Sequence, residues 1–135
     1  RFRLFGASQG GQLAAAIAAR HPDRVEALAL YGTCASGSDL APAEVRKSVV
    51  ALVAAHWGLG LKALAGAFVT DPTAEDLAGF AKFQRASASA AVAARLLEVY
   101  YDTDIRDLLP AVQAPTVVVH READRGTNEP EGEAT

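Results

Sequence analysis

The feature that most constrains this chain is a Gly-x-Ser-x-Gly sequence near its start, with Gly6, Ser8 and Gly10 at the fixed positions. A short apolar run precedes it, and an alanine-rich run with apolar residues at helical spacing follows it to about Arg20. This order predicts a strand, a tight turn and a helix, with the serine at the turn. Because such a turn strains the backbone and crowds strand against helix, small residues are expected two positions before and two positions after Ser8.

The predicted turn has the form of a nucleophile elbow. It would expose the Ser8 hydroxyl above the carboxyl end of the strand, and the backbone N–H of Gln9 would point to where an oxyanion forms. The alternative is a turn of small residues with no chemistry. A phosphate-binding glycine loop does not fit, because neither a Gly-Lys-Ser/Thr ending nor Gly-x-Gly-x-x-Gly spacing is present. The motif therefore favours a serine nucleophile.

A second strand is predicted from Val25 to Tyr31, after the helix stops at His21 and Pro22. Strand, helix and strand within about thirty residues form a βαβ unit, for which a right-handed crossover is expected. His21 is best explained as a C-terminal cap that interacts with the helix dipole. Cys34 lies in the loop of small residues after the second strand, where it is either a second nucleophile or, more commonly for such a residue, an unreactive thiol.

Four helices with no strand among them are predicted between about residues 39 and 103. Such an insertion between strands would form an all-helical cap that covers the serine and shapes a substrate pocket. Its content of Ala, Leu, Val and Phe predicts an apolar pocket wall. His56 and Trp57, at the end of the first helix, either line the pocket or are a surface histidine and a packed tryptophan. The helices are expected at 43–57, at 61–69, from about 73, and from Ser87 or Ser89 to Tyr100, with Gly58 and Gly60 ending the first of them.

The last predicted strand is the β-branched run from Thr116 to His120. Its lack of alternation is typical of a strand buried on both faces. Glu122 and Asp124 follow it, and an acidic residue after a central parallel strand is well placed to orient a catalytic histidine. Residues 126–135 contain no apolar residue larger than alanine, so a disordered polar tail is expected.

Composition narrows the class of protein. A length of 135 residues allows at most one domain, and the absence of Met together with a strand that starts almost at Arg1 suggests a piece of a longer protein. The net charge of −3 and the lack of a basic stripe argue against nucleic-acid binding.

The chain contains no apolar run of about eighteen residues, which argues against a membrane span. The single cysteine fits a reducing, cytoplasmic compartment, and the spacing of Cys and His predicts neither a metal site nor a cofactor. Abundant Ala and a preference for Arg over Lys suggest a bacterial gene.

On these residues the chain resembles the α/β-hydrolase fold family, from its nucleophile elbow to the strand that carries its acid. The resemblance rests on three motifs in the same order: Gly6–Gly11, His21–Gly32 and Asp104–His120. It is closest to bacterial hydrolase domains that are sometimes joined to a nucleotide-cyclase or regulatory domain. It implies an α/β class chain with a partial α/β-hydrolase fold over residues 1–125, in which parallel strands carry the inserted helical cap.

The resemblance also implies roles for individual residues. Ser8 would be the nucleophile, Gln9 would supply a backbone N–H to the oxyanion hole, and Gly6 and Gly10 would be the elbow glycines. Asp124 would be the acid of the triad.

For the acid, Glu122 is the alternative, and a plain polar loop residue is the other reading of Asp124. The catalytic histidine of this family follows the acid, but no histidine follows Asp124, and His120 precedes it. The upstream strands and the loop with the second oxyanion donor are also absent from the sequence. The segment by itself is therefore expected to be a poor catalyst.

Three functions compete at this point. The leading one is a serine hydrolase that acts on an ester or related carbonyl compound through a Ser8 acyl-enzyme. The second is a non-catalytic, ligand-binding or sensory domain that signals to a fused regulatory or nucleotide-cyclase partner. The third is a degenerate fragment with no function.

Overall fold

The computed structural model describes residues 1–68 and 73–121, without the side chains of residues 66–68. By its contacts the chain divides into two compact units. The sheet unit consists of Arg1–Leu40 and the chain from Asp102 onward, and the helical unit consists of Ala41–Tyr101. The predicted polar tail, residues 126–135, lies outside the described residues.

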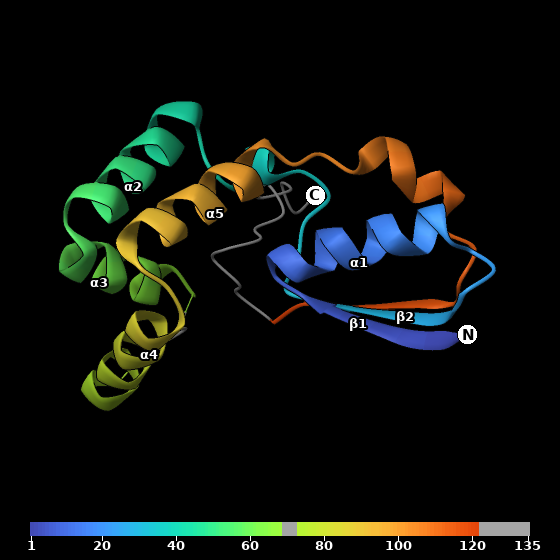
Figure 1. Cartoon of the computed structure of the whole chain (residues 1–135), viewed down its shortest axis with the longest axis horizontal. Helices are drawn as coiled ribbons and strands as arrows, with labels where there is room; N and C mark the ends of the chain where they lie inside the picture. Colours follow the sequence, from blue (N-terminus) through green and yellow to red (C-terminus); the bar gives the residue numbers. More distant parts are fainter. Residues whose placement is uncertain (69–72, 122–135) are drawn as a thin grey trace, which may run out of the picture. The chain divides into compact units, whose positions relative to one another are not determined.

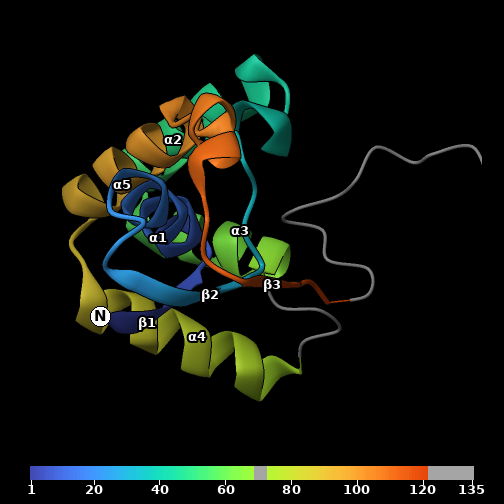
Figure 2. The ribbon, with the colours of Figure 1, turned by 90° about the vertical axis from the view of Figure 1, so that its right-hand side faces the viewer.

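The sheet unit contains three parallel strands in the order β1-β2-β3. They are β1 (Phe2–Ala7), β2 (Val25–Tyr31) and β3 (Thr116–Val119), and helix α1 (Gln9–Arg20) connects the first two. Figure 2 shows the strands side by side with α1 on one face of the sheet. The predicted α/β class, the parallel sheet and the βαβ unit are thereby confirmed.

Small residues bring α1 close to the sheet. Ala14, Ala15 and Ala18 are spaced along one side of the helix and are almost completely buried. Because an alanine side chain is a single methyl group, the helix backbone can pack tightly on the larger residues of β2. The core of this unit is formed by Ala14, Ala15, Ala18, Val25, Leu28, Leu30 and Ile105.

Strand β3 differs from the prediction in its burial. The β-branched run forms a strand, but its four residues are all exposed, with Val117 54% and Val118 56% accessible. Among the described strands, β3 pairs only with β2, so it is an edge strand and not a central one. The expectation of burial on both faces is therefore wrong in this structure.

The helical unit contains the four predicted helices, which Figure 1 shows in green to orange. The first boundary was misplaced by the sequence argument, because the helix that starts at Ala43 ends at Ala55 and Trp57 already opens the next one. Gly58 and Gly60, expected to end the first helix, lie inside the second. The helices are α2 (Ala43–Ala55), α3 (Trp57–Phe68), α4 (Ala74–Ser87) and α5 (Ala90–Asp102).

Gly60 lies inside a helix because α2 and α3 approach each other closely there. A Cβ atom at Gly60 would lie 2.9 Å from the Cα of Val53, a residue that is completely buried. Trp57 packs against the same cluster, which Val53, Leu64 and Ala94 form. Trp57 is thus a packing residue of this unit, whereas His56 is exposed at the turn between α2 and α3.

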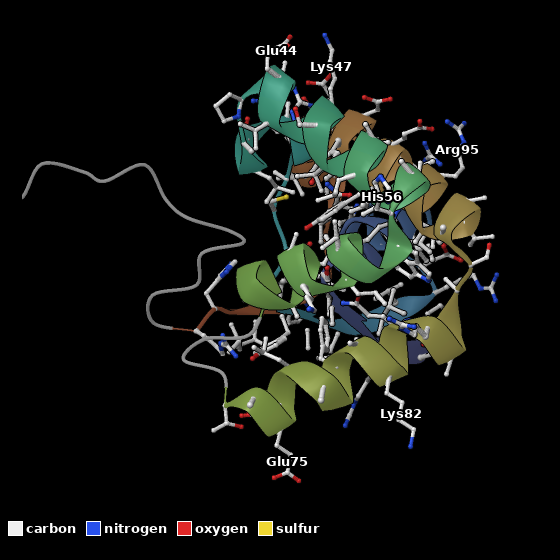
Figure 3. The ribbon with its side chains drawn as sticks, turned by 90° about the vertical axis from the view of Figure 1, so that its left-hand side faces the viewer. Glu44, Lys47, His56, Glu75, Lys82 and Arg95 are labelled. Atoms are coloured by element: carbon white, nitrogen blue, oxygen red, sulfur yellow. The ribbon has the colours of Figure 1, made fainter. Side chains whose placement is uncertain are left out.

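Charged side chains project from the helices of the helical unit. Figure 3 shows Glu44, Lys47 and Arg95 pointing outward from the helices. Glu44 and Lys47 form an exposed ion pair at 3.1 Å, one turn apart on α2. Such exposed pairs contribute little to stability. Across the described residues, none of the helices is both long enough and apolar enough to span a bilayer.

Candidate functional site

Ser8 lies between the end of β1 and the start of α1 in a strained conformation. Its φ is 52° and its ψ is −130°, and it is the one non-glycine residue with positive φ in the described part of the chain. A conformation of this kind costs about 1–3 kcal/mol and persists only where the surrounding structure holds it. Here the Ser8 N–H donates to the carbonyl of Tyr31 at 3.0 Å, and the Ser8 carbonyl accepts from the Gly11 N–H at 2.9 Å. Both sides of the bend are thus fixed.

The Ser8 side chain is not used to cap its own helix. A serine at an N-cap normally accepts a hydrogen bond from an N–H in the first helical turn. The Ser8 side chain makes no such bond, and the residue is exposed. Ser8 is thus exposed at the carboxyl edge of the sheet, and its side chain is not held by a bond to the helix.

The bend requires a glycine on the strand side. A Cβ atom at Gly6 would lie 2.6 Å from the Gly10 carbonyl oxygen and 2.7 Å from the Gly11 Cα. The same crowding was expected at Gly10, but a Cβ there would meet nothing within 4 Å. The crowded glycine on the helix side is Gly11, because a Cβ atom added there would lie 2.5 Å from the Thr33 side chain.

Gln9 is the first residue of α1. Its backbone N–H therefore belongs to the N-terminal end of the helix, where the partial positive charge of the helix dipole is concentrated. This end of α1 lies directly beside the Ser8 hydroxyl in the chain. The arrangement is suited to stabilising negative charge that develops next to Ser8.

All three strands end level with one another at the edge where Ser8 lies. The Ser8 N–H donates to the carbonyl of Tyr31, the last residue of β2. The N–H of Gly32, which follows Tyr31, donates to the carbonyl of Val119, the last residue of β3, at 3.0 Å. With neighbouring strands about 4.8 Å apart, the end of β3 lies roughly 10 Å from the Ser8 backbone. The chain that leaves β3 therefore starts near Ser8. Asp124 and Glu122 belong to that continuation and lie outside the described residues, so their roles stay predictions.

The described histidines differ in their relation to Ser8. His21 caps the far end of α1 through a backbone N–H that donates to Ile17 at 2.9 Å. The predicted C-cap position is confirmed, and the interaction of His21 with the helix dipole stays a prediction. Because α1 has 12 residues, His21 lies roughly 18 Å from Ser8. His56 belongs to the helical unit, and His120 is exposed directly after β3.

Two segments of the sheet unit pair with each other, one just before the helical unit in the chain and one just after it. Ser36 and Asp104 form an antiparallel bridge, flanked by hydrogen bonds of 2.9 Å from Ile105 to Ala35 and from Gly37 to Thr103. We call residues 35–37 and 103–105 the neck. It begins four residues after β2 ends, and thus close to the edge of the sheet that carries Ser8.

An ion cluster supports the neck. The Arg106 Nε donates to both carboxylate oxygens of Asp104 at 3.0 Å, and Asp39 lies 3.9 Å from the same guanidinium. The side-chain hydrogen bond from Arg106, followed by one from its backbone, lowers the pKa of Asp104. The same carboxylate raises the pKa of Arg106.

An apolar cavity of about 480 Å³ lies within the sheet unit. Its wall includes Gly11 and Ala15 of α1, Leu30 of β2, and the thiol-bearing residue Cys34. The cavity could hold an apolar group but offers few polar partners. In the described ranges, His, Cys, Asp and Glu side chains form no group of three that could bind a metal ion.

One buried residue beside the site was missed by the sequence argument. Gln12 lies one turn after Ser8 and is only 2% exposed. Its amide Nε2 lies 3.5 Å from the Thr103 carbonyl and 3.9 Å from the Cys34 Sγ. The available signal was a glutamine among the small and apolar residues of α1.

Comparison with known protein families shows which family the sequence matches. The family described as serine aminopeptidase, S33, matches residues 1–134. The match thus includes the strained serine, the helical unit and β3. No curated protein matches the chain significantly.

Proposed function

Because the chain belongs to the serine aminopeptidase S33 family of α/β-hydrolases, its chemistry is that of a hydrolase, and we propose that Ser8 is the nucleophile. The observation that carries this proposal is the conformation of Ser8: a strained, exposed serine whose hydroxyl does not cap the helix that it begins. Strain of this kind persists where the surrounding structure imposes it, and it concentrates at active sites.

In the proposed reaction the Ser8 Oγ attacks the carbonyl carbon of an ester or related substrate. The new C–O bond converts the carbonyl oxygen to an oxyanion, which the Gln9 N–H at the start of α1 stabilises. The tetrahedral intermediate then expels the alcohol and leaves an acyl group on Ser8. Water attacks this acyl ester, releases the acid and restores the hydroxyl.

Proton transfer in this scheme needs a histidine base that accepts the Ser8 proton and passes it to the leaving alkoxide. In the serine, acid, histidine order of this fold the base comes from beyond the acid. We assign Asp124 as the acid that orients it, with Glu122 as the alternative. The shared edge of the three strand ends supports this assignment, because the chain that carries Asp124 starts there.

We propose an ester with an acyl or small hydrophobic group as the substrate, and the helical unit as the cap of the site. The support is its position in the chain: the unit is inserted through the neck, soon after the carboxyl end of β2. Its sequence is rich in Ala, Leu and Val, which suits an apolar pocket wall.

Labelling with a fluorophosphonate tests the nucleophile. In the full-length protein, the adduct should map to Ser8 by mass spectrometry and disappear in Ser8→Ala. The matched control is Ser87→Ala, which alters an exposed serine of α4 and should label like the wild type. If the folded wild type shows no adduct on Ser8, the proposal fails, and retained binding of a hydrophobic ester would then favour a sensory domain.

Substrate class is tested separately with a nitrophenyl ester and an aminoacyl nitroanilide. We expect faster turnover of the ester. Faster turnover of the anilide would overturn the ester assignment while leaving Ser8 as the nucleophile.

A further inference from the structure

We infer that Gln12 is a positioning residue for the reaction, one that fixes the first turn of α1 to the neck and to the loop after β2. This inference rests on the proposed role of Ser8. The group that it would position is the N-terminal end of α1, which carries both the Ser8 bend and the Gln9 N–H.

The first support is the location of the Gln12 side chain. Gln12 lies in the first turns of α1, four residues after Ser8, so the two residues share one side of the helix. The residue is 2% exposed and is one of the largest fully enclosed side chains of the chain. A movement of this side chain is therefore coupled to the helix turn that begins at Ser8.

The second support is the identity of its neighbours. The amide Nε2 is within 3.5 Å of the carbonyl oxygen of Thr103, which belongs to the neck, and within 3.9 Å of the Cys34 Sγ. Thr103 and Cys34 come from separate segments, and the same neck carbonyl also accepts from the Gly37 N–H. One side chain thus connects the helix to the two segments that join the sheet unit to its insertion.

The third support is that burying a glutamine side chain at this position is energetically unfavourable. Its Oε1 is buried and has no hydrogen-bond partner within the described part of the chain. A buried acceptor without a partner is unfavourable, so an apolar residue of the same size would fill the space at lower cost. The polar contact to the neck accounts for an amide here, whereas packing alone does not.

Gly11 shows that the same turn of α1 is in close contact with the loop. Its Cα lies so near Thr33 that a Cβ atom would lie 2.5 Å from that side chain. Gly11 permits the close approach of α1 to this loop, and the neighbouring Gln12 makes the polar contacts to Thr103 and Cys34. Together they define where the N-terminal end of α1 lies against the carboxyl edge of the sheet.

The test is Gln12→Met in the full-length protein, because methionine keeps the length of the side chain and removes the hydrogen-bond donor. We expect the rate constant of Ser8 acylation, or kcat with an ester, to fall about 10- to 100-fold, the effect of a small misplacement of reacting groups, with KM changed less than threefold. Thermal stability should be equal to or above that of the wild type. Gln113→Met, which alters an exposed glutamine of the sheet unit just before β3, is the matched control and should leave kcat unchanged.

A second readout keeps this inference separate from the proposed function. Reaction of the Cys34 thiol with a maleimide should be at least threefold slower in Gln12→Met, because the amide N–H that donates to the sulfur, and so favours the reactive thiolate, is replaced by an apolar group. Unchanged kcat and unchanged Cys34 reactivity would overturn the inference and leave Ser8 as nucleophile. If the wild type is not acylated at Ser8, the proposed function fails, and the role of Gln12 in catalysis fails with it even where Cys34 becomes less reactive. If Gln12→Met does not fold, Gln12→Leu replaces it with the same expected results.

Discussion

At the residue scale, the bend at Ser8 depends on which neighbours lack a side chain. A Cβ atom added at Gly6 would lie closer to the Gly10 carbonyl oxygen than real Cβ atoms lie to other atoms. A Cβ atom added at Gly10 would point into open space. Two glycines at symmetric positions around the serine therefore have different physical roles. The first makes room for the bend, and the second is a replaceable helix residue.

Substitution of the two glycines should separate these roles. Gly6→Ala should lower the free energy of unfolding by at least about 2 kcal/mol, because the added methyl group collides with backbone atoms that cannot rotate away. Gly10→Ala should leave it unchanged or raise it by up to about 1 kcal/mol, since alanine favours the helix. Urea unfolding followed by circular dichroism measures both. Equal losses in the two variants would contradict this account of the bend.

The acid of the proposed triad gives a second prediction at this scale. Asp124→Asn should lower kcat by about 10⁴-fold, because the histidine would no longer be held in the productive tautomer. Glu122→Gln serves as control and should keep kcat within a few-fold of the wild type. A large loss in Glu122→Gln with an active Asp124→Asn would transfer the acid role to Glu122.

At the element scale, helix ends and helix crossings are set by specific side chains. Thr73 and Asp76 form a capping box at the start of α4: the Thr73 Oγ1 accepts from the Asp76 N–H at 3.1 Å, and the Asp76 carboxylate accepts from the Thr73 N–H at 3.0 Å. Hydrogen bonds from the Thr73 side chain and then its backbone lower the pKa of Asp76. The start of α4 is therefore sensitive to acid.

Thr73→Ala should destabilise α4 by about 1 kcal/mol, the usual cost of a lost N-cap. The contribution of Asp76 is fully present above its unfolded pKa of about 3.9, and because its folded pKa is lowered, that contribution is lost as pH falls through the folded value. Amide hydrogen exchange in the first turn of α4 should accordingly quicken relative to α2 below about pH 4, after correction for intrinsic rates. An α4 whose protection is independent of pH in that range would contradict the role of the capping box.

The crossing of α2 and α3 gives a prediction for a second pair of glycines. Gly60→Ala should lower the free energy of unfolding by about 1–3 kcal/mol, because the methyl group would meet the Val53 backbone at 2.9 Å. Gly79→Ala is the control, since a Cβ there meets nothing within 4 Å and alanine improves helix propensity by up to about 1 kcal/mol. If both variants were stabilised, α2 and α3 would not cross as closely as described.

At the scale of the whole molecule, what the sequence could predict depends on how local the cause is. The strand, turn and helix around Ser8 were predictable because the motif and the periodicity lie within twenty residues. Gly60 was mistaken for a helix end, because its packing against Val53 is tertiary. Gln12 stood out only as a glutamine among small and apolar residues, and its contacts could not be predicted, since its partners lie 22 and 91 residues away in the chain. The exposure of β3 likewise depends on which strands pair with it.

The neck leads to a prediction about the acid stability of the whole chain, because both connections between the two units run through it. The lowered pKa of Asp104 means that its contribution to stability is present above pH 4 and is lost as pH falls through its folded value. Asp104→Asn should therefore reduce the loss of thermal stability between pH 5 and pH 3, whereas Asp23→Asn, an exposed carboxylate of the same unit, should not. Identical acid profiles for wild type and Asp104→Asn would show that the ion cluster does not support the neck.

The positive φ of Ser8 carries an evolutionary consequence. Glycine is the residue that accepts such a backbone without penalty, so the exchange most favourable for folding at this position is also the one that deletes the hydroxyl. Variants selected only for heat resistance would drift toward that exchange. On the proposed role of Ser8, an intact serine at this position marks a lineage in which catalysis has outweighed stability.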